Sequence, residues 1–293
     1  MLWRGGRRSD NVEDRRGSGG IGGGGFGGGR MGGGGVKVGG LGLVVIVLVG
    51  MFFGVDPSAL LSGLEGGGGS DVGYQQDAST AGAPPEDDEA AQFVRAVLAD
   101  TEDTWSAIFK EGNATYRAPH LVLFSDRINS ACGMAGAAMG PFYCPADSKV
   151  YIDLTFYDEL KQRFRAPGDF AQAYVIAHEV GHHVQHLLGI TDKVGNQSGA
   201  DSDSVRVELQ ADCFAGIWAY HANQRGKVET GDVDEALTAA TAIGDDRLQE
   251  ESQGTVVPDS FTHGTSAQRV RWFKRGMENG DINACDTFNA KSL

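Results

Sequence analysis

A glycine-rich region near the N-terminus limits how much of this 293-residue chain can fold into a core. Eighteen of the first forty residues are Gly, in runs such as 22–25 and 32–35. Glycine has no side chain to bury, and its backbone loses more conformational entropy on folding than that of any other residue. We therefore predict that residues 1–37 form a disordered tail.

An uncharged and strongly apolar stretch follows, from Val38 to Val55. Eighteen residues at 1.5 Å rise form a helix about 27 Å long, which is close to the thickness of a bilayer's hydrocarbon core. A cleaved signal peptide and a buried core segment are the alternatives. The sequence FFGVD at 52–56 is a poor cleavage site, and the glycine-rich flanks offer no domain in which to bury the stretch. We predict a single transmembrane signal anchor at 38–55.

The charges on either side of this stretch predict its orientation. The tail carries seven basic and three acidic residues, a balance of +4, so the rest of the chain carries −14 minus 4, or −18. The positive-inside rule then places the tail in the cytoplasm and everything after Val55 outside. Residues 56–85, with Gly66–Gly69 and Pro84-Pro85, are expected to form a flexible linker to a domain at 86–293. The predicted location is the cell membrane, with an extracytoplasmic domain.

The cysteines and the net charge indicate the surroundings of that domain. Its four cysteines favour two disulfides in an oxidising compartment, and three pairings are possible. We favour Cys132 with Cys144 and Cys213 with Cys285. A cysteine metal site is the alternative, but the chain has no CxxC spacing. The acidic balance argues against nucleic acid as a partner.

Apolar periodicity predicts an α+β domain that is mainly helical with a small sheet. Residues 150–154 alternate between apolar and polar side chains, as in a half-buried strand. Helical spacing, capping residues and glycine stops predict helices at 88–110, 169–188, 205–225, 232–243 and 265–278.

The second of these helices contains the sequence His-Glu-Val-Gly-His at 178–182. His178 and His182 are four residues apart, about one helical turn, so both imidazoles project from one side and can bind one tetrahedral ion. Glu179 lies beside such an ion, where it can take a proton from a bound water. Histidines that only pack in a core or face solvent are the alternative reading of the motif.

A catalytic zinc ion needs a third protein ligand and an open position for water. The helix at 205–225 offers Glu208 and Asp212, two carboxylates one turn apart in a mostly apolar stretch. One could bind the metal, while the other accepts the second ring proton of a ligating imidazole. A solvated acidic face is the alternative, but acidic side chains seldom sit among Val, Leu, Phe and Trp without a partner.

These motifs resemble those of a known family. HExxH followed by ExxxD is similar to the gluzincin pattern of zincin metallopeptidases. The resemblance is closer to the bacterial family of "putative neutral zinc metallopeptidases" and covers about residues 86–293, with a similar anchored layout and the glycine-rich tail outside it. The matching stretches are YCPADSKVYIDL at 143–154, AHEVGHHVQ at 177–185, ELQADCFAG at 208–216 and THGTSAQR at 262–269.

The resemblance implies a zincin-like fold with one zinc ion per chain. His178, His182 and Glu208 are then the metal ligands, Glu179 is the general base and Asp212 supports a ligating histidine. His263 lies within the last matching stretch and could donate a hydrogen bond to the oxyanion of a tetrahedral intermediate. A packing role for His263 is the alternative, with Tyr151 and Tyr220 as other candidate donors.

The function expected from these residues is a membrane-anchored peptidase that hydrolyses peptide or protein substrates with a zinc-activated water. By analogy with zincins, the strand at 150–154 could pair with an extended substrate. A catalytically idle zinc-binding envelope scaffold would use the same ligands without needing Glu179. A metal-free interaction domain would bind no stoichiometric zinc, and a zinc hydrolase for other amides is a further alternative.

Overall fold

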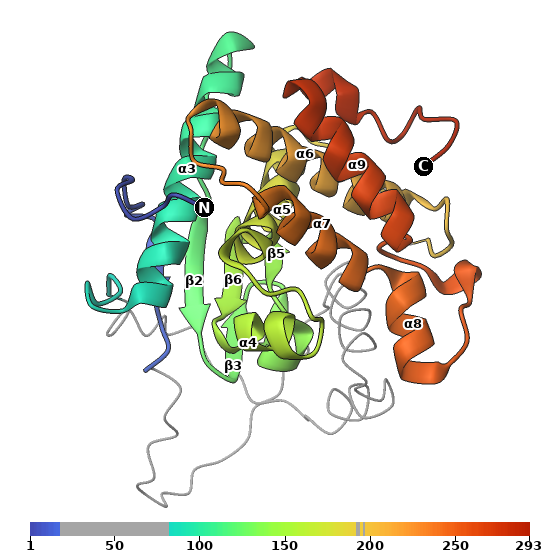
Figure 1. Cartoon of the computed structure of the whole chain (residues 1–293), viewed down its shortest axis with the longest axis horizontal. Helices are drawn as coiled ribbons and strands as arrows, with labels where there is room; N and C mark the ends of the chain where they lie inside the picture. Colours follow the sequence, from blue (N-terminus) through green and yellow to red (C-terminus); the bar gives the residue numbers. More distant parts are fainter. Residues whose placement is uncertain (18–81, 192–193, 196) are drawn as a thin grey trace, which may run out of the picture.

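The computed structural model describes residues 1–17, 82–191, 194–195 and 197–293, which form a small sheet packed beside a group of helices (Figure 1). This mixture confirms the α+β prediction. The expected transmembrane segment 38–55 and residues 56–81 of the expected linker lie outside the described residues. Among the residues that the structure does describe, no helix is both long enough and apolar enough to cross a bilayer.

The main sheet has four strands in the order β1-β2-β6-β5. The first three run parallel, and β5 runs antiparallel to β6. Their bounds are Val12–Asp14 (β1), His120–Phe124 (β2), Phe142–Cys144 (β5) and Lys149–Asp153 (β6). A separate hairpin pairs Arg127–Ser130 (β3) with Gly133–Gly136 (β4). The predicted strand at 150–154 is thus β6, but its neighbours on both sides leave no edge for a substrate, so the predicted pairing is wrong.

The helices pack around one face of this sheet and against one another (Figure 1). Their bounds are Glu89–Glu111 (α3), Thr155–Gln162 (α4), Asp169–Leu187 (α5), Asp203–Gln224 (α6), Asp232–Ala242 (α7), Asp245–Gln253 (α8) and Ser266–Asn279 (α9). Short 3-10 segments lie at Ala137–Met139 (η1), Pro258–Ser260 (η3) and Ile282–Cys285 (η4). All five predicted helices are present within two residues at each end, whereas α4 and α8 were not predicted.

Glycines allow α5 and α6, and likewise α6 and α9, to approach closely. A Cβ on Gly181 of α5 would lie 3.0 Å from the carbonyl oxygen of Ala211 on α6. A Cβ on Gly276 of α9 would lie 1.9 Å from the carbonyl oxygen of Cys213, so only glycine fits there. Since Gly181 stands within the His-Glu-Val-Gly-His sequence, the contact brings α6 against the part of α5 that carries both histidines.

The first seventeen residues do not form the disordered tail that was predicted, and residues 18–37 of that tail lie outside the described residues. Strand β1 pairs with β2, and the side chains of Met1, Trp3 and Val12 are buried in the main core. Most glycines of residues 1–37 lie at or after Gly17, so the glycine-rich composition of the whole range does not describe its first sixteen residues. Arg4, Arg7, Arg15 and Arg16 of the segment pair with acidic residues, as Arg7 does with Glu102 and Asp103 of α3. The predicted domain boundary at residue 86 is wrong for this reason.

Two disulfides tie peripheral segments to the fold. Cys132 pairs with Cys144, which joins the β3–β4 hairpin to strand β5, and Cys213 pairs with Cys285, which joins η4 to α6. These are the two pairings that the sequence analysis favoured.

Candidate metal centre

Helices α5 and α6 bring three potential metal ligands to one point. His178 and His182 extend from α5, and Glu208 extends from the facing side of α6. Nε2 of His178 lies 3.2 Å from one carboxylate oxygen of Glu208, and Nε2 of His182 lies 3.5 Å from the other. One donor atom from each residue lies within 4.8 Å of the other two. The structure therefore assembles the three residues that the sequence predicted as ligands.

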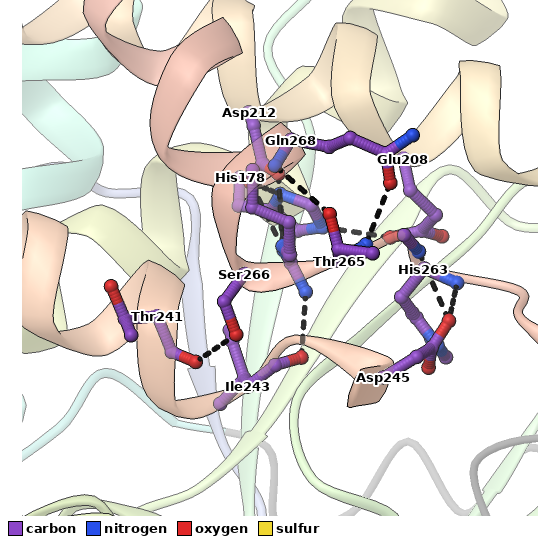
Figure 2. Close-up of polar contacts among 12 residues, drawn as sticks. His178, Glu208, Asp212, Thr241, Ile243, Asp245, His263, Thr265, Ser266 and Gln268 are labelled. Carbon is purple, nitrogen blue, oxygen red and sulfur yellow. Dashed lines mark hydrogen bonds and ion pairs between the residues drawn. The ribbon is translucent and has the colours of Figure 1, made fainter. Parts of the chain in front are cut away.

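Asp212 orients the first of these histidines. Its Oδ1 lies 2.9 Å from Nδ1 of His178, so the ring donates its Nδ1 proton to the carboxylate and directs Nε2 toward Glu208 (Figure 2). Asp212 is fully buried, one turn after Glu208 on α6. It occupies the supporting position that the sequence analysis assigned to it.

A buried arginine beneath the site was not predicted. Nε and Nη2 of Arg269, on α9, donate to the two carboxylate oxygens of Asp212 at 2.9 Å each. The hydroxyl of Tyr174 donates to Asp212 as well, at 2.5 Å. Burial alone would raise the pKa of Asp212, but Arg269 and His178 outweigh it and hold the pKa below its usual value. Asp212 thus favours its ionised form although it is fully buried.

His182 has a different support, which the sequence analysis also missed. Its Nδ1 lies 2.9 Å from Oε1 of Gln185, three residues later on α5. The amide nitrogen of Gln185 donates to the carbonyl oxygen of Val207 and to Oε1 of Gln210, both on α6. Because these bonds fix the amide, Oε1 must be the atom that faces His182 and accepts its ring proton. Both histidines therefore present Nε2 to the same point.

Glu179 lies beside the three ligands without belonging to the cluster. It is buried, and its carboxylate interacts electrostatically with His178, His182 and Glu208. Burial is the largest influence on Glu179 and raises the pKa of its carboxyl above the usual value, although the two histidines oppose the shift. A carboxylate of raised basicity is suited to accepting a proton.

A loop before α9 places His263 near Glu208, and the two side chains interact electrostatically. The carboxylate of Asp245, at the start of α8, accepts the backbone N–H groups of Thr262, His263 and Gly264 and also contacts Nδ1 of His263 at 3.3 Å (Figure 2). Burial would lower the pKa of His263, but Glu208 and Asp245 raise it above its usual value. The structure thus brings His263 to the site, and Asp245 is an unpredicted residue that holds its loop.

The two tyrosines considered as alternative donors are engaged elsewhere. The hydroxyl of Tyr151 donates to Asp147 at 2.7 Å, and its ring stacks on Phe142. Tyr220 lies twelve residues after Glu208 on α6, which corresponds to about 18 Å along the helix axis. Neither tyrosine is therefore placed to donate a hydrogen bond to an oxyanion at the site.

The donor set suits a divalent cation. Two imidazole nitrogens and one carboxylate converge, and each histidine has its other nitrogen fixed by a hydrogen bond, as zinc sites require. Burial would lower the pKa of His178, yet Asp212 and Glu208 raise it to about 10. The cluster therefore attracts positive charge strongly. Two histidines one turn apart on one helix, a glutamate on a second and an adjacent buried glutamate match the HExxH pattern of zinc-binding sites.

Comparison with known proteins agrees with this class. The chain belongs to the "putative neutral zinc metallopeptidase" family, whose model matches residues 1–288. The match extends over the glycine-rich region, which the sequence analysis had left outside the resemblance. No solved structure matches the chain.

Two relatives share most of its length. The uncharacterized protein YpfJ of Escherichia coli K12 is 53% identical over 294 residues, covering 98% of this chain and 99% of the relative. The uncharacterized protein Rv2575 of Mycobacterium tuberculosis H37Rv is 41% identical over 257 residues, covering 83% and 86%.

Proposed function

We propose that this protein is a zinc-dependent peptidase with one zinc ion per chain, bound by His178, His182 and Glu208 in a zincin-like arrangement. The observation that carries the proposal is the convergence of these three donor groups beside the buried carboxylate of Glu179. Zinc at this position supplies a Lewis acid that activates water and polarises the scissile carbonyl. The family to which the chain belongs supports both the metal and the class of reaction.

Glu179 is the general base in this proposal. Its carboxylate accepts a proton from the attacking water and then passes that proton to the nitrogen of the leaving amine. The position of Glu179 supports this role, because its buried carboxylate lies beside the three candidate ligands, where the attacking water would be. A zinc scaffold without catalysis would not need a buried carboxylate at this point.

His263 is the proposed donor to the oxyanion that forms at the attacked carbonyl. The carboxylate of Asp245 contacts Nδ1 of His263, and Glu208 and Asp245 both favour the protonated ring. A ring nitrogen that donates from this position would supply a hydrogen bond to a developing negative charge. Asp245 is a positioning residue, because it holds the loop and not the substrate.

The substrate would bind along β5 rather than along β6. Among the described strands, β5 pairs only with β6, so its other edge has no strand partner. Tyr143 of β5 also contacts the metal-bearing helix, since its hydroxyl lies 3.0 Å from Nδ1 of His183. An extended peptide that adds to this edge would place its backbone close to α5.

The decisive test replaces Glu179 with Gln in the full-length chain. The Glu179→Gln variant should keep one zinc ion per chain, because Glu179 is not a ligand, and should lose casein hydrolysis by at least about 100-fold. Glu278→Gln, at an exposed position on α9, is the matched control and should behave like the parent. Zinc in every form without hydrolysis in the parent would favour the scaffold, and undiminished hydrolysis by Glu179→Gln would exclude the assigned base.

A further inference from the structure

We infer that residues 1–17 and residues 82–293 lie on the same side of any membrane that the chain contacts. The inference is independent of the zinc site and rests on the way the N-terminal segment completes the fold. It revises the topology expected from charge, in which the first residues were cytoplasmic and the domain extracytoplasmic.

The backbone of the segment is part of the main sheet. Val12, Glu13 and Asp14 pair in parallel register with Leu121, Val122 and Leu123 of β2. Hydrogen bonds continue beyond the strand at both ends, from the N–H of Leu121 to the carbonyl of Asn11 and from the N–H of Arg15 to the carbonyl of Leu123, each at 2.8 Å. The Asp14 N–H also donates to the carbonyl of Gly82. The end of the segment 1–17 and the start of the segment that begins at residue 82 therefore meet at this edge of the sheet.

Side chains of the segment are buried against the rest of the domain. Trp3 is 7% exposed and packs edge to face against Phe93 of α3, with ring centroids 5.5 Å apart. The hydroxyl of the fully buried Ser9 donates to Glu102 of α3 at 2.5 Å. Without the segment, Glu102 would lose its bonds from Ser9, Asn11 and Arg7 and remain as a carboxylate with few partners.

Such contacts cannot form across a membrane. Hydrogen bonds between strands require a separation of about 4.8 Å, whereas a hydrocarbon core is about 30 Å thick. Between residues 17 and 82, the sequence has one uncharged stretch long enough to cross, at 38–55. A single crossing there would separate β1 from β2. The pairing of β1 with β2 is therefore incompatible with a single membrane crossing between residues 17 and 82.

Thiol labelling of the full-length protein in spheroplasts tests this topology directly. Asp10 is 99% exposed and Glu251 is 48% exposed, and all native cysteines within the described residues are in disulfides. Asp10→Cys and Glu251→Cys, made separately, are treated with a membrane-impermeant maleimide in spheroplasts, with detergent lysis as the reference for full labelling. Both thiols should react, or both should stay protected until lysis. Labelling of only one of them would overturn the inference.

A stability measurement on the purified full-length chain tests the docking itself. Trp3→Ala should lower the midpoint of thermal unfolding by roughly 5–15 °C, because it leaves a cavity beside Phe93. Leu2→Ala, at a neighbouring side chain that is 58% exposed, should change the midpoint by about 2 °C or less. Equal midpoints for the Trp3→Ala variant and the parent would show that the segment does not dock, and would also overturn the inference.

Discussion

The guanidinium of Arg269 contacts both carboxylate oxygens of Asp212, through Nε and Nη2 at 2.9 Å each. One of the same oxygens accepts the Nδ1 proton of His178. His178, a proposed metal ligand on α5, is thus held by a carboxylate on α6, which in turn is held by an arginine on α9. Since these supports are buried, each can be tested by a substitution that leaves all three ligands in place.

Arg269→Gln should weaken zinc binding by about 10- to 100-fold, because Asp212 loses the partner that orients it toward His178. The dissociation constant, measured by competition with a chelator on folded protein, checks this. Arg271→Gln, at an exposed position on the same helix, is the matched control and should bind zinc like the parent. Unchanged affinity in the Arg269→Gln variant would mean that Asp212 needs no support from α9.

Gln185→Leu should release zinc faster than the parent by about tenfold, because Nδ1 of His182 loses its acceptor. The rate of zinc loss to excess chelator is the measurement. Gln162→Leu, at an exposed position, is the control and should have no effect. Equal rates for the parent and the Gln185→Leu variant would remove Gln185 from the site.

His263→Ala should lower kcat by about 100- to 1000-fold, with KM and zinc content close to those of the parent. The reason is that an oxyanion donor acts in the transition state and contributes little to substrate binding. His120→Ala removes a half-exposed histidine on β2 and serves as the control. A rise in KM with unchanged kcat would instead assign His263 to substrate binding.

The buried carboxylate of Asp100 should make stability depend on pH in acid. It is bound by Arg225 and Lys227 at 2.7 Å each and by the indole N–H of Trp218. Burial raises its pKa, but Arg225 and Lys227 outweigh burial, so the folded pKa lies below the usual value of 3.8. The stability from Asp100 is therefore fully present above pH 3.8 and is lost as the pH falls through the lower, folded value.

Asp100→Asn should accordingly destabilise the protein by about 3 kcal/mol at pH 7, because it leaves two cations without their buried partner. The difference from the parent should shrink as the pH falls below 3.8. Denaturant unfolding at pH 7 and at several values below 4 measures both effects. Asp103→Asn, at a half-exposed site, is the control and should cost less than about 1 kcal/mol. A difference between Asp100→Asn and the parent that does not change with pH would contradict the assignment.

The helices, and the convergence of the candidate ligands, could be predicted because their signals are local. His178 and His182 are one turn apart on a single helix, and Glu208 and Asp212 are one turn apart on another. Apolar periodicity defines each helix over about twenty residues, so the spacing alone places each pair on one face. The sequence also showed that two such pairs suit one metal, through the chemistry of their side chains.

Contacts between distant segments could not be predicted in this way. Arg269 is 57 residues from Asp212, and Ser9 is 93 residues from Glu102. The alternation that indicates a strand is too short to recognise in a segment such as β1, which has three residues. Its place in the sheet depends on β2, more than a hundred residues later.

The sequence by itself determined the set of candidate metal ligands, because side-chain identity and helical spacing are properties of short stretches. Only the tertiary structure decided which buried groups hold those ligands, which strand has a free edge and on which part of the domain the first seventeen residues lie. The physical reason is that the packing of α5, α6 and α9, and the pairing of β1 with β2, are set by contacts between surfaces far apart in the chain.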